Sequence, residues 1–143
     1  MKIQSIALAT VFVTFVFAGV PTAGLAAGPE APRETITPAF AHTLANVTGR
    51  VLTALVVTYP PGGKTPPHRH GQAFVIGYVL EGAIRSRIDN GNAQVFHAGE
   101  SWTENPGVHH IVSENASGTK PAKLLAVFIA DATQKDLVTL DHN

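Results

Sequence analysis

The sequence predicts an all-β protein, built as an antiparallel sandwich or a small barrel. Short runs rich in apolar and β-branched residues recur between residues 51 and 129, and such runs favour strands. Turn signals rich in Gly, Pro, Asn and Asp separate these runs about every eight to twelve residues. No long segment of this region shows a helical pattern, so the turns and the strand-like runs together indicate the fold class.

The individual strands follow from these runs and their breaks. The apolar run 73–80 predicts a strand covered on both faces. The segment Asp89-Asn90-Gly91-Asn92 predicts a hairpin, because Asn and Gly accept positive φ. We expect strands at residues 51–59, 73–80, 83–88, 93–96, 101–103, 108–113 and 123–129.

The chain divides into four segments by composition. Residues 1–26 are expected to form a signal peptide. Residues 27–45 are expected to form an N-terminal arm and a first strand, with the extended arm at residues 27–39. Residues 46–131 are expected to form the β-barrel. The tail, residues 132–143, shows no strong period, and its residues 133–140 are compatible with a helical turn. The mature chain is long enough for one domain with one core.

The first 26 residues have the three parts of a secretion signal. Lys2 precedes an apolar run at 6–20, and small residues such as Gly24 and Ala26 follow it. The alternative, an uncleaved membrane anchor, is disfavoured because the run is shorter than the roughly 20 residues that a span needs. We therefore expect a secreted or periplasmic protein without a stable membrane anchor after cleavage.

Composition excludes several partners and ligands. The formal net charge is zero and no basic stripe is present, which argues against nucleic acid as a partner. The chain has no cysteine, so it forms no disulfide and offers no thiolate to a metal. A metal site in this protein must use His, carboxylate, amide or water.

Histidines follow two loops that break the chain. His68 and His70 come after a loop rich in Pro and Gly, and on a strand their side chains would leave on the same face. His109 and His110 follow a second break, and only one of two adjacent strand residues faces inward. A site of three histidines is therefore predicted; the alternative is a set of surface histidines near turns.

These residues resemble the two motifs of the cupin family. The spacing of that family is matched by Gly62, His68, His70 and Gly82, and then by Gly99, Gly107 and His110. The resemblance covers roughly residues 50–130 and selects His110, rather than His109, as the third ligand. It implies a double-stranded β-helix, or jelly roll, a metal in the barrel, and a homodimer.

The chain departs from the family pattern at one position that bears on the metal. The family's metal-binding Glu falls at Val75, or at Phe74 with the shorter spacing, and neither side chain binds metal. Two further departures, Asn105 and Glu114, lie at turn and strand positions. The resemblance then implies three neutral imidazoles around one divalent transition metal: Fe, Zn, Cu, Ni or Mn. Such a site favours a bidentate anionic ligand, and some three-histidine cupins are iron dioxygenases.

Three other residues are candidates for the surroundings of the metal or for substrate contacts. Gln72 continues the alternation of His68 and His70, and either an inward position or a solvent-facing one fits. Glu104 is the carboxylate nearest the cavity mouth, although a solvated loop charge is the favoured interpretation. Trp102 is expected to line the cavity or to pack beneath it.

Three functions remain open at this point. The first is a metal-dependent enzyme, dioxygenase-like, that acts on a small organic molecule in the barrel. The second is a non-catalytic module that binds or senses a metal or small ligand. The third is a barrel without metal.

The aromatic residues Phe74 and Tyr78 are expected to point outward and therefore need cover, either from the segment around Phe40 or from a second subunit.

Overall fold

The computed structural model describes residues 32–141, a part of the chain that contains eleven β-strands and no helix. This confirms the predicted all-β class. None of the described residues lies in a helix long and apolar enough to cross a membrane. The strands are β1 (Thr35–Thr43), β2 (Arg50–Tyr59), β3 (Lys64–Thr65), β4 (His68–Arg69), β5 (Phe74–Glu81), β6 (Ala83–Ile88), β7 (Gln94–His97), β8 (Ser101–Glu104), β9 (His109–Asn115), β10 (Ala122–Asp131) and β11 (Thr139–Leu140).

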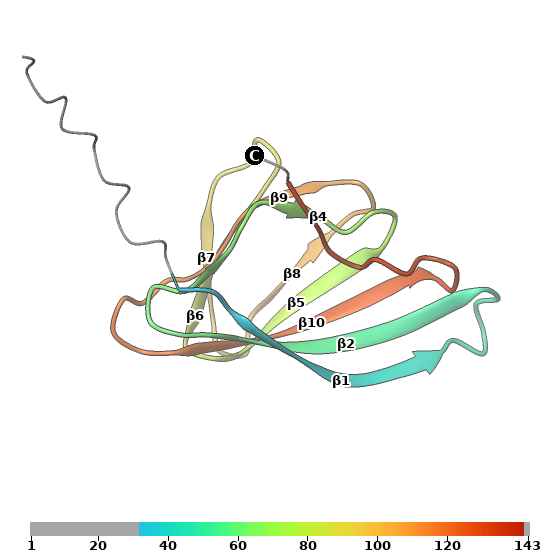
Figure 1. The fold of residues 1–143 in the computed structure, drawn as a ribbon, viewed down its shortest axis with the longest axis horizontal. Coiled ribbons are helices and arrows are strands. Elements are labelled where there is room, and N and C mark those ends of the chain that lie inside the picture. Colours follow the sequence, from blue (N-terminus) through green and yellow to red (C-terminus); the bar gives the residue numbers. More distant parts are fainter. Residues whose placement is uncertain (1–31, 142–143) are drawn as a thin grey trace, which may run out of the picture.

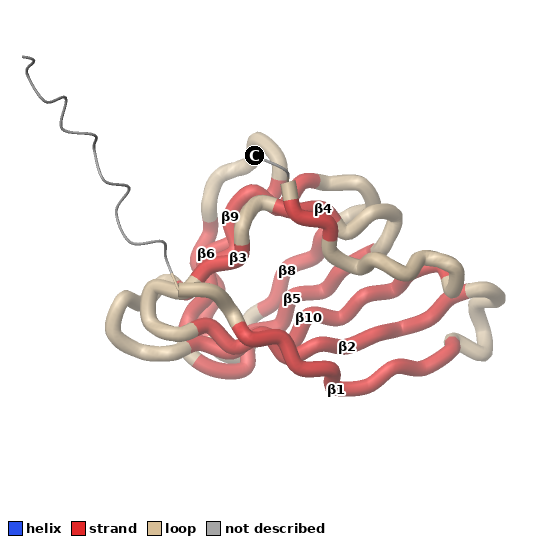
Figure 2. The backbone as a smooth tube through the Cα atoms, viewed as in Figure 1, coloured by secondary structure: helices blue, strands red, loops and turns tan. Residues whose placement is uncertain are grey.

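The strands form two antiparallel sheets that face each other (Figures 1 and 2). One sheet has the order β1-β2-β10-β5-β8, and the other has the order β11-β4-β9-β6-β7, with β3 also paired to β9. Neighbouring strands are distant in sequence, as β2 beside β10 shows. This arrangement is the predicted jelly roll, and it brings residues that are distant in the described part of the chain to one interior.

The core lies between the sheets and follows the two-residue period of the strands. In β10, Leu124 and Phe128 are buried, and in β5, Val75 and Val79 are buried. Tyr78, with the opposite parity, is 41% exposed. Tyr78 therefore lies on the outer face of β5, as expected. Burying each large apolar side chain contributes roughly 1.5–3 kcal/mol.

The N-terminal strand begins earlier than expected. β1 starts at Thr35, within the segment 27–39 that was predicted to be an arm, and its register shifts between Pro38 and Phe40. Because β1 is the outermost strand, this irregularity and the proline are tolerated. Phe40 lies in the same sheet as β5 rather than over its outer face, so of the two alternatives for covering that face, this segment is ruled out.

The C-terminal tail is extended, and the helical turn that its sequence allowed at 133–140 does not form. Its polar groups bond at long range instead: the side-chain amide of Gln134 donates to the backbone carbonyl of His70, at 2.9 Å. Thr139 and Leu140 then pair with β4. The tail thus closes over the loop that carries His70. The predicted signal peptide lies outside the described residues, as does His142.

Candidate metal centre

Three histidines from two segments converge in the interior. His68 lies on β4 directly opposite His110 on β9, and His70 follows β4 by one residue. All three are buried, and one ring nitrogen from each lies within 4.8 Å of the others. The neighbouring His109 turns away, and its Nε2 lies 2.8 Å from Asp141 Oδ2. The sequence prediction that His110 faces inward is therefore confirmed.

Each of these rings has one nitrogen held by an oxygen. His68 Nδ1 donates to the Pro66 carbonyl at 2.8 Å, and His70 Nδ1 donates to the Leu137 carbonyl at 2.7 Å. For both rings, this leaves Nε2 as the nitrogen that carries the lone pair. His110 Nε2 is 2.9 Å from Ser86 Oγ, and its Nδ1 is buried without a hydrogen-bond partner. This is the way in which metal-binding histidines are oriented in proteins.

Burial keeps two of the rings neutral. Loss of water contacts lowers the pKa of His68 from its usual 6.5 to about 4, and burial also lowers the pKa of His70. The desolvation outweighs the hydrogen bonds to the Pro66 and Leu137 carbonyls, which act in the opposite direction. At neutral pH, both rings are thus in the form that binds metal.

Glu104 belongs to the same cluster, and its predicted place as a solvated loop charge is wrong. Strand β8 runs one residue further than expected, so Glu104 faces inward with Trp102 and is only 2% exposed. Its Oε1 accepts the indole N–H of Trp102 at 3.0 Å and lies 3.1 Å from His110 Nδ1. Its Oε2 is 3.5 Å from His70 Nε2 and has no hydrogen-bond partner.

Glu104 is ionised at neutral pH. Burial alone would raise its pKa, but the contacts with His110 and His70 outweigh burial and lower the pKa below the usual value of 4.5. A buried carboxylate with a free oxygen beside ring lone pairs needs a proton or a cation between them. We call His68, His70, His110 and Glu104 the histidine–glutamate cluster. Its donor types and its unpaired atoms fit a divalent transition metal.

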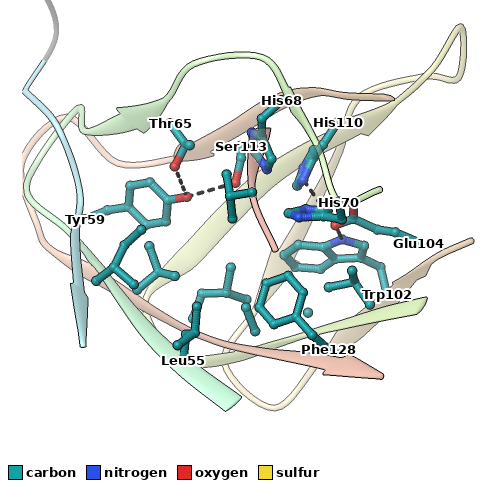
Figure 3. Close-up of a pocket in the computed structure, with 17 residues that line it drawn as sticks. Leu55, Tyr59, Thr65, His68, His70, Trp102, Glu104, His110, Ser113 and Phe128 are labelled. Atoms are coloured by element: carbon teal, nitrogen blue, oxygen red, sulfur yellow. Dashed lines mark hydrogen bonds and ion pairs between the residues drawn. The ribbon is translucent and has the colours of Figure 1, made fainter. Parts of the chain in front are cut away.

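A second polar group lies elsewhere on the wall of the same cavity (Figure 3). Tyr59 Oη lies 2.8 Å from both Thr65 Oγ1 and Ser113 Oγ, and all three residues are buried. We call these three residues the hydroxyl cluster. Burial in the cavity wall raises the pKa of Tyr59, so its phenol stays neutral.

The cavity between these clusters is small and mainly apolar. Its volume is about 50 Å³, and its apolar walls include Leu55, Val57, Leu124 and Phe128. A water molecule needs about 10–15 Å³ on this measure, so the space suits a few non-hydrogen atoms. Trp102 lines the cavity, as expected, and its ring covers Gly77, where a Cβ atom would come within 2.5 Å of the indole.

Gln72 is not part of the site. It is exposed, and its backbone N–H donates to the side chain of Gln134. The alternation that links it to His70 fails because Gly71, at φ 59°, turns the chain between them. His42 and His97 are exposed and lie outside the site.

Sequence reasoning missed several residues that build the site. Ser86 orients His110, and Leu137 holds His70 from the far end of the chain. Tyr59 had a usable signal, since it continues the inward series of Leu55 and Val57 on a predicted strand. Nothing in the local sequence indicates the Leu137 contact, because its role depends on a backbone carbonyl 67 residues away.

Comparisons with known proteins agree with this architecture. The family model described as "Cupin domain" matches residues 55–128. Germin-like protein 1-1 of Oryza sativa subsp. japonica is 29% identical over 118 residues, which cover 80% of this chain and 53% of that protein. Oxalate oxidase 1 of Hordeum vulgare is 38% identical over 61 residues, which cover 38% of this chain and 30% of that protein. The chain therefore spans about half, or less, of these relatives.

A solved structure supports the fold alone. A protein of Klebsiella pneumoniae subsp. pneumoniae MGH 78578 with a double-stranded beta-helix domain superposes with a TM-score of 0.60 at 18% sequence identity. The match covers 81% of this chain and 90% of that one. The two-sheet arrangement described above is therefore found in a protein of similar length.

Proposed function

The chain belongs to the cupin family, and we propose that it holds one divalent transition metal on His68, His70 and His110 and converts a small organic ligand in the adjacent cavity. The metal is one of Fe, Zn, Cu, Ni or Mn. The observation that carries the proposal is the state of the three rings. Each has one nitrogen beside an oxygen that fixes the ring. One ring nitrogen from each histidine lies within 4.8 Å of the others.

The cavity restricts the ligand to a small molecule. Its volume of about 50 Å³ admits a few non-hydrogen atoms beside the cluster. A bound metal would supply Lewis-acid activation of a ligand oxygen and, for iron, one-electron chemistry with O₂. A small carboxylate or enolate fits this setting, because its charge complements the metal while its carbon atoms contact Leu124 and Phe128. The likeness to a protein named oxalate oxidase supports an acid of this size.

A non-catalytic binding or sensing protein is the second candidate, and one observation favours it. Among the described residues that line the cavity, Tyr59 is the one ionisable residue outside the histidine–glutamate cluster. Its phenol is neutral and already bonded to two hydroxyls. The cavity thus offers no additional base, so turnover would depend on the metal and its immediate neighbours.

The cellular setting and the assembly complete the proposal. The signal-like residues 1–26 support export to the periplasm or beyond. Exposed Tyr78, together with partly exposed Phe74 and Ile76, forms an apolar strip on the outer face of β5. This strip supports a homodimer, in which a second copy covers it. Analytical ultracentrifugation of the wild type and of Tyr78→Glu tests this part, and a monomeric wild type would contradict it.

Metal content is the direct test of the function. Elemental analysis of the protein purified from its own compartment should give close to one transition metal per chain, and His110→Ala should remove it. His109→Ala is the matched control, since the adjacent ring faces outward and should leave the metal in place. Full metal retention in His110→Ala would contradict the assignment.

Oxygen uptake separates the enzyme from the binding protein. The metal-loaded wild type should consume O₂ with a member of a panel of small dicarboxylates, β-dicarbonyls, catechols and thiols if the metal is iron. Binding of the same compounds without turnover, followed by calorimetry, would favour the second candidate.

A further inference from the structure

We propose that Glu104 is the fourth protein ligand of the metal, supplied by strand β8 in place of the side chain at Val75 on strand β5. The inference rests on the proposed function, since it presumes that the three histidines hold a metal. It changes the donor set from three neutral nitrogens to three nitrogens and one anionic oxygen.

The first argument is the register of the sheet. Val75 and Glu104 are direct partners in the antiparallel ladder between β5 and β8. Side chains at paired positions leave the sheet on the same face, with Cβ atoms about 4.5–5.5 Å apart. Both residues are 2% exposed, and both line the cavity. A carboxylate on either strand therefore reaches the same part of the interior.

The second argument is the carboxylate's own contacts. Oε1 is fixed by the Trp102 indole at 3.0 Å, which sets the rotation of the group. Oε2 is buried without a hydrogen-bond partner, and so is His110 Nδ1. Two unpaired polar atoms in one buried cluster are costly unless a ligand satisfies them. A cation in the cluster would satisfy both atoms together.

The third argument is the charge of the site. His68 and His70 are held in one tautomer by backbone carbonyls, so neither is arranged to donate a proton from Nε2 to Glu104. His70 Nε2 nevertheless lies 3.5 Å from Glu104 Oε2. Two hydrogen-bond acceptors that face each other at this distance repel one another. A metal ion between His70 Nε2 and Glu104 Oε2 would remove this repulsion, since the ion binds a lone pair of each atom. With Glu104 bound, a divalent metal keeps one net positive charge for an anionic ligand.

The test uses Mn²⁺ and Zn²⁺ as probes with the full chain stripped of metal. Calorimetric titration of Glu104→Gln should show affinity for each ion lowered about 100-fold or more, because the amide keeps the size but loses the charge. Glu81→Gln is the matched control. It makes the same change of charge on the neighbouring strand, where Glu81 is exposed and pairs with Lys123. This variant should leave affinity within about twofold of the wild type.

An exchange of the two residues is the sharper experiment. The double variant Val75→Glu and Glu104→Val keeps the composition and returns a carboxylate from β5, so it should recover metal affinity to within about tenfold of the wild type. A purely structural role for Glu104 would not be rescued in this way. Full loss of binding in the exchange variant, with folding intact, would count against the ladder argument.

Infrared spectroscopy of the wild type needs no variant and covers the case in which Glu104→Gln fails to fold. Metal addition should shift a carboxylate stretching band, and absence of any shift in a metal-loaded sample overturns the proposal. If Glu104→Gln folds and binds as tightly as the wild type, Glu104 is not a ligand, although the three-histidine site stands. If the wild type binds neither ion, the proposal for Glu104 fails, and the proposed function fails for Zn and Mn.

Discussion

Two buried polar clusters share one cavity, and they differ in whether their hydrogen bonds are complete. In the hydroxyl cluster, Tyr59 has a partner at 2.8 Å on each side. In the histidine–glutamate cluster, His110 Nδ1 and Glu104 Oε2 have none. Both clusters draw residues from the two facing sheets, and all of their residues are buried.

The difference separates a structural polar group from a binding site. Buried polar atoms that satisfy one another add rigidity and need nothing further. Buried atoms that lack partners cost free energy until a ligand supplies the missing contacts. The unpaired cluster also contains the residue types that bind transition metals, whereas the complete cluster holds only hydroxyls. The contrast predicts which substitutions change metal binding and which change stability alone.

The largest expected effect is stabilisation by metal. A ligand that binds only the folded state at 1,000 times its Kd adds about 4 kcal/mol to the free energy of unfolding. Adding Zn²⁺ to the metal-free protein at such a ratio should therefore raise Tm by roughly 10–20 °C in a domain of this size. Scanning calorimetry measures the shift. His110→Ala should abolish it, and an equal shift in that variant would break the contrast between the clusters.

Acid should destabilise the metal-free protein by a somewhat smaller amount. The pKa of His68 is about 4 in the folded protein and 6.5 in the unfolded chain. Between these values the unfolded state binds more protons, so stability is full above pH 6.5 and falls as the pH drops toward 4. The loss from His68 is about 3 kcal/mol, and the lowered pKa of His70 acts in the same direction.

Urea unfolding at a series of pH values checks this dependence. His68→Gln should flatten the curve between pH 6.5 and 4, because the amide does not titrate. A wild-type protein whose stability stays constant across this interval would show that the rings are not held neutral by burial.

The sequence predicted the histidines of the site but not their surroundings. His68, His70 and His110 follow chain-breaking loops, and this signal can be read in the sequence itself. Glu104 was misjudged because a one-residue error at the end of β8 decides whether a side chain is exposed or buried. For Gln72 the sequence allowed both an inward and a solvent-facing position, and the structure decides for the solvent because a turn at Gly71 interrupts the alternation. The carbonyls that orient the rings carry no side-chain signal.

Removing the phenol oxygen should affect stability without affecting the metal. Tyr59→Phe leaves Thr65 Oγ1 and Ser113 Oγ without their shared partner, at a cost of about 2 kcal/mol. Metal affinity should stay within about twofold of the wild type, since the cluster that binds metal is untouched. Urea unfolding and calorimetric titration measure the two quantities.

Tyr78→Phe is the matched control for this change. Tyr78 is 41% exposed, and the same substitution there should alter the free energy of unfolding by less than about 0.5 kcal/mol. A large loss of metal affinity in Tyr59→Phe would show that the hydroxyl cluster is not merely structural.

The smallest expected effect concerns the indole that orients Glu104. Trp102→Phe removes the N–H that bonds Glu104 Oε1 but keeps an aromatic ring beside Phe96, 4.9 Å away between ring centroids. Loss of a group that orients a metal ligand lowers metal affinity about 10- to 100-fold. We expect a loss of about 10-fold, or about 1.4 kcal/mol, because His110 and His70 still flank the carboxylate. Titration with Mn²⁺ measures the change. In the Glu104→Gln background, Trp102→Phe should lower metal affinity little further, because the two side chains act through one interaction. Additive losses of affinity would mean that Trp102 supports the histidines independently of Glu104.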